Sequence, residues 1–439
     1  MDYDTIIIGG GPGGLAAAYT LADEQRVLVI ENHWWGGTCP NFGCDPKKML
    51  YSAVEARDWS ARMTGNGLVG IPDISWPRLM AFKRSYTSGI PGGTKTGLNQ
   101  AGIVTVDGKA QLVDAHTVTV DGQNYTADHI VIATGQTPTM PDIPGVGLLG
   151  TSTDFLDLDQ LPRTMAFIGG SYVALELANI AATAGAEVHL IVHSDRLLRA
   201  FPESAVKTLI GQLKQKRIQI HENVSLTEVK AVGDQVKLIA DDFELTVYRA
   251  FAAMGRSAVT DLNLDAVGVA YDHKGIHVDN HLKTSVDSIY AIGDVIAKTQ
   301  PKLTPVSSFE GRYVAQHILG QTDPIQYPVI PTIVFSATKV AQVGVSLDEA
   351  KQDVTRYQVV TNNTTPWYTY NRIKDPIAQT TTIVDKTTGH LVGAVVVSTL
   401  ADEMINAFTG IINQKLSSDA VNRQIYAYPT PISDLSYYY

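Results

Sequence analysis

Short β-branched runs alternate with helix-forming stretches at the start of the chain. Asp4 to Ile8 and Val27 to Ile30 are apolar runs typical of buried parallel strands. The turn after the first run carries a G-x-G-x-x-G pattern at Gly9, Gly11 and Gly14. Such glycines let the backbone approach a pyrophosphate at a helix N-terminus, and Glu31 after the second run can accept a ribose hydroxyl. We therefore predict a dinucleotide site, with a plain tight turn as the alternative.

The same pattern occurs a second time in the middle of the chain. Thr164 to Ile168 and Val188 to Val192 read as strands on either side of a helix that ends near Gly185. Small residues occupy the motif positions, namely Gly169, Ser171 and Ala174. Because small residues still permit close approach, we predict a second nucleotide unit here. A helix that serves only for packing is the alternative.

The residues after the second strand of this unit bear on the choice between NADH and NADPH. An NAD site usually has a carboxylate there, whereas an NADP site has cations. This chain has His193 at that point, with Arg196 and Arg199 close behind. We expect NADPH and consider NADH less favoured. In the alternative interpretation both arginines belong to a solvated surface.

The rest of the hydrophobic pattern predicts further helices and strands, most of which carry no candidate functional residues. We expect amphipathic helices at 51–64 and 76–89, a glycine-rich turn at 91–93, hairpin strands at 104–113 and 117–120 around Asp121-Gly122, and a buried strand at 130–132 that runs into Thr134 and Gly135. Strands at 357–361, 379–384 and 391–397 and a helix at 401–414 indicate an α+β domain at the C-terminal end.

These elements predict an α/β protein with two Rossmann-like dinucleotide-binding domains and a C-terminal α+β dimerisation domain. We expect one nucleotide domain over 1–145 and 256–322, the other over 146–255, and the dimerisation domain over 323–439.

Charge and composition narrow the class of protein. Lys and Arg number 34 against 44 Asp and Glu, a net charge of −10, which argues against a nucleic-acid surface. We see no basic leader and no apolar run long enough to span a bilayer. We therefore expect a cytoplasmic protein without membrane or nucleic-acid partners, and no metal site.

The only two cysteines, Cys39 and Cys44, lie five positions apart. A loop that short restrains the unfolded chain little, so a structural disulfide would stabilise little. A zinc site would need further ligands, usually a second pair of cysteines. A redox-active pair that opens and closes fits better, although zinc and chance remain as alternatives. Two nucleotide units and one dithiol together suggest that hydride passes from one nucleotide through a flavin to a disulfide.

These motifs resemble the class I pyridine nucleotide-disulfide oxidoreductases, the flavoprotein family that includes glutathione reductase and dihydrolipoamide dehydrogenase. The resemblance covers nearly the whole chain, and its most specific part is the dithiol stretch at 36–48. Further matching segments are 133–135, 255–256, 289–295, 303–306, 311–312 and 330–344.

The resemblance implies roles for individual residues. Cys39 would be the interchange thiol that attacks substrate, and Cys44 the thiolate that faces the flavin. Lys47 would pair with Glu176 near the flavin N5. The residues implied for FAD are Gly9, Gly11, Gly14, Glu31, Gly37, Thr38, Thr134, Gly135, Asp294 and Thr304. Those implied for NAD(P)H are Gly169, Ser171, Tyr172 as a lid, Ala174, His193, Arg196, Arg199, Gly255 and Arg256. The family also implies a two-fold homodimer with shared active sites.

The chain departs from the family at two positions. Disulfide reductases of the family carry a catalytic histidine near the C-terminus, where this chain has Tyr428, with Asp434 near the place of the orienting carboxylate. A phenol titrates near pH 10 and is a poor base at neutral pH. Asp45 follows Cys44 directly, and a carboxylate close to a thiol disfavours the thiolate. We expect its side chain to point into solvent.

Three functions are compatible with this sequence. The first is NAD(P)H-dependent, FAD-dependent reduction of a small disulfide, similar to that of glutathione reductase. The second is reduction of metal ions or quinones, which the missing histidine favours. Mercuric reductases of the family share a tyrosine at this position, but they and the large thioredoxin reductases need an extra cysteine pair that this chain lacks. The third is a redox sensor or interaction protein with little turnover.

Overall fold

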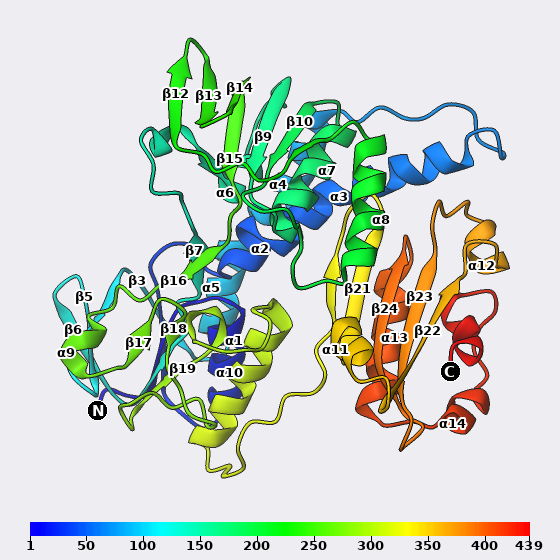
Figure 1. Cartoon of the computed structure of the whole chain (residues 1–439). Coiled ribbons are helices and arrows are strands. Elements are labelled where there is room, and N and C mark those ends of the chain that lie inside the picture. The colour runs from blue at the N-terminus through cyan, green and yellow to red at the C-terminus, as the bar shows by residue number, and fades with distance from the viewer. The chain divides into compact units, whose positions relative to one another are not determined.

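The apolar runs form the central sheets of two units in the computed structural model, which describes residues 1–439 (Figure 1). The first unit contains 1–49, 80–139 and 255–326, and the second contains 50–79, 140–254 and 327–439. None of the helices combines the length and the apolar character that a bilayer crossing requires.

The first unit is built on a seven-stranded sheet. Its strands are β1 (Tyr3–Ile8), β2 (Val27–Glu31), β3 (Val104–Asp107), β4 (Ala110–Leu112), β5 (Thr117–Val120), β6 (Gln123–Ile132) and β19 (Ile289–Ala291). The order is β3-β2-β1-β6-β5-β4, with β19 also paired to β6. Strands β3, β2, β1, β6 and β19 run parallel, whereas β5 and β4 form an antiparallel extension. Ile6, Leu28 and Ile130 lie side by side in register and are fully buried.

The other elements of this unit surround that sheet. They are α1 (Pro12–Leu21), α2 (Thr38–Phe42), α5 (Ile90–Gln100), α9 (Leu264–Val267), η2 (Gly293–Val295), α10 (Thr304–Ile318), β7 (Gln136–Pro138), β16 (Arg256–Ala258), β17 (Tyr271–Asp272) and β18 (Gly275–Ile276). Helices α1 and α10 pack against each other although nearly 300 positions separate them in the sequence (Figure 1). Two helices, α3 (Cys44–Met63) and α4 (Trp76–Thr87), contribute residues to both units.

Three segments of the first unit differ from the sequence-based expectation. Residues 104–107 do not pair in a hairpin but extend the parallel edge beside β2. The turn at Asp121-Gly122 instead joins β5 to β6. The expected turn at 91–93 is the start of α5, because a proline is tolerated in the first turn of a helix, where its missing N–H would have no partner.

The second unit begins with a parallel sheet in the order β11-β10-β9-β15-β8. Its strands are β8 (Gly150–Thr151), β9 (Thr164–Ile168), β10 (Glu187–Ile191), β11 (Gln219–His221) and β15 (Arg249–Ala252). The accompanying elements are η1 (Val146–Leu148), α6 (Ser152–Phe155), α7 (Tyr172–Thr183), α8 (Glu203–Gln215) and an antiparallel sheet of β12 (Glu228–Val232), β13 (Gln235–Ala240) and β14 (Phe243–Val247). Phe155, Phe167 and Phe251 form an aromatic cluster in the core of this part.

The C-terminal part of the second unit is an antiparallel sheet in the order β20-β21-β24-β23-β22. Its strands are β20 (Thr332–Val334), β21 (Lys339–Gly344), β22 (Tyr357–Asn363), β23 (Gln379–Asp385) and β24 (Leu391–Ser398), and its helices are α11 (Leu347–Gln352), α12 (Tyr368–Asn371), α13 (Ala401–Asn413), α14 (Ser418–Asn422) and η3 (Pro431–Tyr437). Helix α13 packs on β21 and β24 and buries Met404 and Phe408. The predicted α/β fold with two Rossmann-like sheets and a C-terminal α+β domain is confirmed.

The same backbone conformation occurs directly after β1 and directly after β9. Gly9 and Gly169 have φ of +117° and +132°, a region that favours glycine. A Cβ atom on Gly9 would collide with the carbonyl oxygen of Ala133, and one on Gly169 with that of Ala253. The first glycine of each motif is therefore required by the turn itself.

Tyr438 and Tyr439 close the core of the C-terminal domain. Tyr438 is only 4% exposed and stacks on Trp367, with ring centroids 5.2 Å apart. Its hydroxyl lies 3.3 Å from that of Tyr370, and the Tyr439 hydroxyl donates a hydrogen bond to the Leu416 carbonyl oxygen at 2.6 Å. The aromatic end of the chain, which the sequence leaves without an assigned role beyond interface packing, thus fills a core within its own chain.

We expect Tyr438→Ala to destabilise this domain by about 3–5 kcal/mol, because it removes a buried ring and leaves a cavity. Urea-induced unfolding at fixed protein concentration measures the change. Tyr437→Ala is the matched control, since Tyr437 is 72% exposed, and it should cost about 1 kcal/mol or less. Equal losses in both variants would contradict the assignment of Tyr438 to the core.

Candidate active site

A break between two helices brings the two cysteines together. Helix α2 carries Cys39 and ends at Phe42, and α3 begins at Cys44. Between them Gly43 has φ −124° and ψ −118°. A Cβ atom on Gly43 would lie 2.8 Å from the Thr38 carbonyl oxygen and 3.0 Å from the Cys39 Cα atom. The close approach of the two cysteine segments therefore depends on glycine at this position.

The two thiols are electrostatically unequal. The pKa of Cys44 is lowered to about 6, first by the hydrogen bond from Cys39 and then by the positive charge of Lys47, against the opposing effect of burial. The same hydrogen bond, burial and the charge of Cys44 raise the pKa of the Cys39 thiol well above its usual range. A thiolate at the start of a long helix is further favoured by the helix dipole. At neutral pH this difference favours a thiolate at Cys44 and a protonated thiol at Cys39.

Thr304 and Lys47 complete the surroundings of the dithiol within the first unit. The Thr304 Oγ1 atom lies 3.9 Å from the Cys44 Sγ atom, and the Thr304 hydroxyl also interacts with Cys39. Lys47 lies one turn along α3 from Cys44 and is buried. The structure thus brings four of the sequence-predicted residues to one place.

Asp45 does not point into solvent as the sequence analysis expects. Its Oδ1 atom lies 3.8 Å from the Cys39 Sγ atom and accepts the thiol hydrogen bond. Its Oδ2 atom accepts a hydrogen bond from the Tyr86 hydroxyl at 3.0 Å. The expectation fails because Asp45 occupies the first turn of α3, which faces Cys39 across the Gly43 break.

The glycine turn after β1 fits the diphosphate of a dinucleotide. Helix α1 starts after Gly11 and has no side-chain cap, so its first N–H groups are available to an anion. Gly14 is buried behind this turn. Glu31 accepts hydrogen bonds from the backbone N–H groups of Gly10 at 2.7 Å and His33 at 2.8 Å, which fixes its carboxylate at the end of β2. These residues fit FAD.

Two further segments of the first unit carry residues predicted for FAD. Gly37 approaches Gly11 so closely that a Cβ atom would lie 2.6 Å from the Gly11 Cα atom, and Thr38 follows as the exposed first residue of α2. The Thr134 hydroxyl, next to Gly135, donates to the Val259 carbonyl oxygen at 2.7 Å.

Asp294 lies in the short helix η2, which a buried ion pair supports. Its Oδ1 atom accepts a hydrogen bond from Ser307 at 3.4 Å. Glu310 on α10 accepts a hydrogen bond from the Gly293 N–H at 2.7 Å and pairs with Lys298 at 2.7 Å. Sequence analysis misses Lys298 and Glu310, and an acidic residue in an otherwise apolar helix face is the only signal that indicates them.

Ser171 stabilises the second glycine turn through two hydrogen bonds. Ser171 caps α7 by accepting a hydrogen bond from the Ala174 N–H at 3.3 Å, and its hydroxyl donates to the Ala253 carbonyl oxygen at 2.8 Å. Tyr172, the first residue of α7, is 40% exposed. The role of Tyr172 as a lid stays a prediction.

The three residues expected to determine the preference for NADPH or NADH differ in how accessible they are to a ligand. His193 and Arg199 are exposed. The Arg196 guanidinium instead donates to the Phe201 carbonyl oxygen at 2.8 Å, so part of its donor set is already used. In the first unit, Gly255 has φ +139° and Arg256 donates to the Gln136 carbonyl oxygen at 2.5 Å.

Two predicted residues of the second unit have well-defined surroundings of their own. Glu176 is buried on α7 and accepts a hydrogen bond from the Phe335 N–H at 2.8 Å. Tyr428 is 74% exposed and its ring stacks on that of Tyr368, while Asp434 is buried, which raises its pKa. The pairing of Glu176 with Lys47 and the catalytic role of Tyr428 stay predictions.

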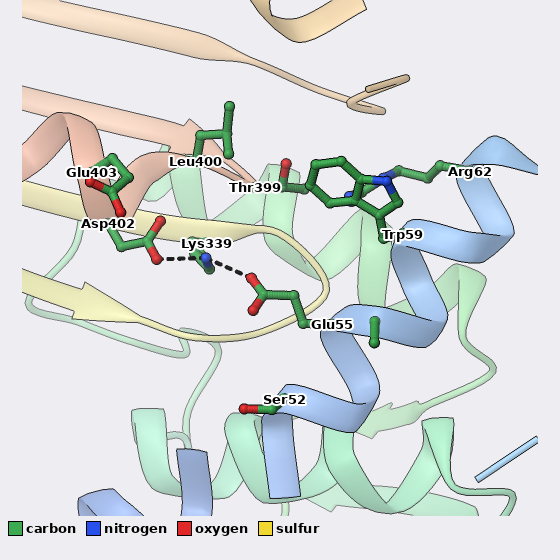
Figure 2. Close-up of a pocket in the computed structure, with 10 residues that line it drawn as sticks. Ser52, Glu55, Trp59, Arg62, Lys339, Thr399, Leu400, Asp402 and Glu403 are labelled. Atoms are coloured by element: carbon green, nitrogen blue, oxygen red, sulfur yellow. Dashed lines mark hydrogen bonds and ion pairs between the residues drawn. The ribbon is translucent and has the colours of Figure 1, made fainter. Parts of the chain in front are cut away.

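The second unit also contains a cavity of about 540 Å³. Figure 2 shows Lys339 between Glu55 and Asp402, each with a carboxylate oxygen 2.7 Å from its Nζ atom. The remaining lining residues are Ser52, Ala56, Trp59, Arg62, Thr399, Leu400 and Glu403. No residue predicted for catalysis or nucleotide binding lines this cavity.

We expect the ultraviolet absorbance of the Cys44 thiolate to titrate with a midpoint at a pH of about 6 in the reduced protein. Because the pKa is lowered, the thiolate is present above this pH and is lost as the pH falls below it. The difference between wild type and Cys44→Ser isolates the signal. Lys47→Met should move the midpoint to higher pH, and a midpoint at 8 or above in wild type would contradict the assignment.

Comparison with known proteins agrees with this geometry. The family described as pyridine nucleotide-disulphide oxidoreductase matches residues 3–311, and its dimerisation domain matches residues 330–434. Dihydrolipoyl dehydrogenase from Mycoplasma pneumoniae is 31% identical over 447 residues, which cover 98% of this chain and 96% of the relative. The enzyme of the same name from Chlamydia pneumoniae is 30% identical over 445 residues, 98% of this chain and 95% of the relative.

Solved structures extend the comparison. The HOCl-induced flavoprotein disulfide reductase RclA from Escherichia coli matches with a TM-score of 0.90 and 25% identity over 99% of either chain. A Cu(II) complex of that reductase gives the same TM-score and identity over 100% of this chain and 99% of the other. The chain described here belongs to the pyridine nucleotide-disulfide oxidoreductases, enzymes that use FAD, NAD(P)H and a redox-active disulfide.

Proposed function

We propose that this enzyme uses NADPH to reduce a small disulfide, with Cys39 and Cys44 as the redox pair. The observation that carries the proposal is the dithiol at the Gly43 break, with Thr304 3.9 Å from Cys44, where the pKa of Cys44 is lowered and that of Cys39 is raised. Thiol–disulfide exchange needs one thiol to attack the substrate and a second to release it. Cys39 would attack the substrate, and the Cys44 thiolate would then release it from the mixed disulfide.

FAD, when bound, supplies the two-electron carrier between the nicotinamide and the Cys39–Cys44 disulfide. The residues proposed to hold it are the glycine turn, Glu31, Gly37, Thr38, Thr134, Gly135, Asp294 and Thr304. Lys47 stabilises the Cys44 thiolate once the disulfide has opened, because its charge lowers the pKa of that thiol. Glu176 is proposed to compensate the charge of Lys47, since a buried cation needs an anionic partner.

The NADPH site is proposed at the turn after β9. Gly169, Ser171 and Ala174 would admit the diphosphate, Tyr172 would act as the lid, and Gly255 and Arg256 would contact the nucleotide. His193 and Arg199 would contact the additional phosphate, since both are exposed. Arg196 is less suited to bind this phosphate, because its guanidinium already donates a hydrogen bond to the Phe201 carbonyl oxygen.

We also propose an assembly and a compartment for this enzyme. The match to the dimerisation domain supports a homodimer, and we propose that its two active sites are shared between subunits. The proposed domains are those of the sequence analysis, with boundaries near 145, 255 and 322. A functional dithiol without other cysteines suits a reducing cytoplasm.

Reduction of a metal ion is the second candidate. Tyr428, which stands where related disulfide reductases have histidine, is exposed and stacks on another tyrosine. Reduction of a disulfide to two thiols consumes protons as well as electrons, whereas a metal ion accepts electrons without protons. The Cu(II) complex of the structurally similar RclA makes copper the first ion to test.

We expect the purified enzyme to oxidise NADPH with glutathione disulfide, and Cys39→Ser to abolish this turnover because the attacking thiol is lost. Consumption of NADPH is followed with glutathione disulfide, lipoamide, Cu(II) and a quinone as separate acceptors. Asp23→Asn, on an exposed loop, is the control for protein quality.

The outcome for Tyr428→His separates the two candidates. If disulfides are poor acceptors, the histidine variant improves them and Cu(II) is fast in wild type, then the enzyme is a metal-ion reductase. Disulfide turnover that survives Cys39→Ser would refute the proposed function.

We expect Arg199→Ala to raise KM for NADPH by about tenfold and to leave KM for NADH unchanged, because a charged hydrogen bond to phosphate contributes about 1.5–3 kcal/mol. Steady-state kinetics with both nucleotides measure the effect. Lys214→Ala, at an exposed position on α8, controls for the general loss of positive charge. A higher kcat/KM with NADH than with NADPH in wild type would contradict the preference.

A further inference from the structure

The contact between Asp45 and the interchange thiol has no counterpart among the predicted roles. The single Cys39 thiol proton has two acceptors, the Cys44 sulfur and the Asp45 Oδ1 atom, which lies 3.8 Å from the Cys39 sulfur. The other carboxylate oxygen, Oδ2, accepts from the Tyr86 hydroxyl at 3.0 Å. Each oxygen therefore has one donor, and the carboxylate is held between the thiol and the phenol.

The position of this carboxylate suits proton transfer. Asp45 is partly buried, and Tyr86 on α4 is 44% exposed, so the pair connects the reacting sulfur with solvent. The other groups that act on Cys39 are Cys44 and Thr304, and neither is free to take its proton. Cys44 has to remain a thiolate in order to attack the mixed disulfide, and an aliphatic hydroxyl is not a base at neutral pH.

We propose that Asp45, oriented by Tyr86, carries the proton of the interchange thiol Cys39, the task that falls to a histidine in related disulfide reductases and for which this chain has Tyr428. This proposal rests on the proposed function, because it takes Cys39 as the thiol that attacks the substrate. Asp45 touches the reacting sulfur and is a catalytic residue in this scheme, whereas Tyr86 is a positioning residue.

The proton and the electrons balance in the proposed step. The Cys39 proton moves to the Asp45 carboxylate while the Cys39 sulfur attacks one sulfur of the substrate disulfide. A mixed disulfide forms, the substrate S–S bond breaks, and its electron pair leaves on the second substrate sulfur. That sulfur takes the proton from Asp45 and departs as a thiol. The Cys44 thiolate then attacks the Cys39 sulfur, which restores the enzyme disulfide and releases the first substrate sulfur as a thiolate.

The charge of Asp45 also helps to keep the two thiols unequal. A carboxylate beside Cys39 disfavours its thiolate and contributes to the raised pKa of that thiol. The groups around Cys39 and Cys44 that carry or change charge are Asp45, Lys47 and Lys48 on α3 and Tyr86 on α4. Removal of the Asp45 charge should therefore ease ionisation of Cys39 while it removes the proton carrier.

Two disulfides with different leaving groups test the proton transfer in the holoenzyme. Glutathione disulfide releases an alkyl thiolate that needs a proton, whereas dithiobis-nitrobenzoate releases an acidic aromatic thiolate that leaves without one. For Asp45→Asn we expect kcat with glutathione disulfide to fall at least about tenfold, and kcat with the aromatic disulfide to change less than about twofold. Tyr86→Phe should give a smaller loss with the same selectivity, and Asp23→Asn should change neither rate.

The alternative outcomes overturn the proposal. Equal losses with both disulfides would show that Asp45→Asn disturbs the site in general, and no loss with either would show that Asp45 carries no proton. The Asp45→Glu variant, which keeps the carboxylate, should recover part of the rate with glutathione disulfide. An absence of recovery together with equal losses would assign Asp45 a purely structural role.

A second measurement does not depend on the electron acceptor. In a Cys44→Ser background Cys39 is the only thiol. The rate of its alkylation by iodoacetamide as a function of pH reports its ionisation. We expect Asp45→Asn to shift this profile to lower pH, and an unchanged profile would refute the contact between Asp45 and Cys39. If wild type reduces neither disulfide, the proposed function fails, and the alkylation profile still decides whether Asp45 acts on Cys39.

Discussion

The hydrogen bond between the two thiols is the interaction on which the candidate active site depends. It places one negative charge on Cys44 and leaves the proton on Cys39, so a symmetrical pair of residues becomes an unsymmetrical pair of reagents. The surrounding structure reinforces this choice. The charge of Lys47 stabilises the Cys44 thiolate, and the charge of Asp45, which contacts Cys39, disfavours a thiolate there. Gly43 makes the arrangement possible, because a Cβ atom at this position would lie within 3.0 Å of the backbone of Thr38 and Cys39.

Periodicity and turn chemistry predict most of the fold from sequence. The β-branched runs at β1, β2, β9 and β10 are buried on both faces, and such runs can hardly be anything but central parallel strands. The glycine motifs are equally readable, since the turn geometry requires them. Prediction fails where local signals mislead. The Pro-Gly-Gly segment opens α5, and β3 joins a parallel edge through contacts with β2 that no local pattern encodes.

The candidate site is predictable where one motif holds its residues together and unpredictable where the fold assembles them. Cys39, Cys44 and Lys47 share one stretch, so their proximity follows from the sequence. Asp45 and Tyr86 are 41 positions apart on different helices, and neither has a pattern that points to the other. The orientation of Asp45 depends on the angle at which α3 leaves the Gly43 break, which a sequence of residue types does not contain.

The ion pair between Lys298 and Glu310 has a consequence for the energetics of cofactor binding. Glu310 holds the Gly293 N–H while its charge is neutralised by a lysine whose side chain is only 4% exposed. The turn that presents Asp294 is thereby fastened to α10 before any ligand arrives. A preorganised carboxylate loses little conformational entropy on binding, so more of the intrinsic interaction energy remains as affinity. Lys298 and Glu310 would then contribute to the affinity for the prosthetic group without contacting it.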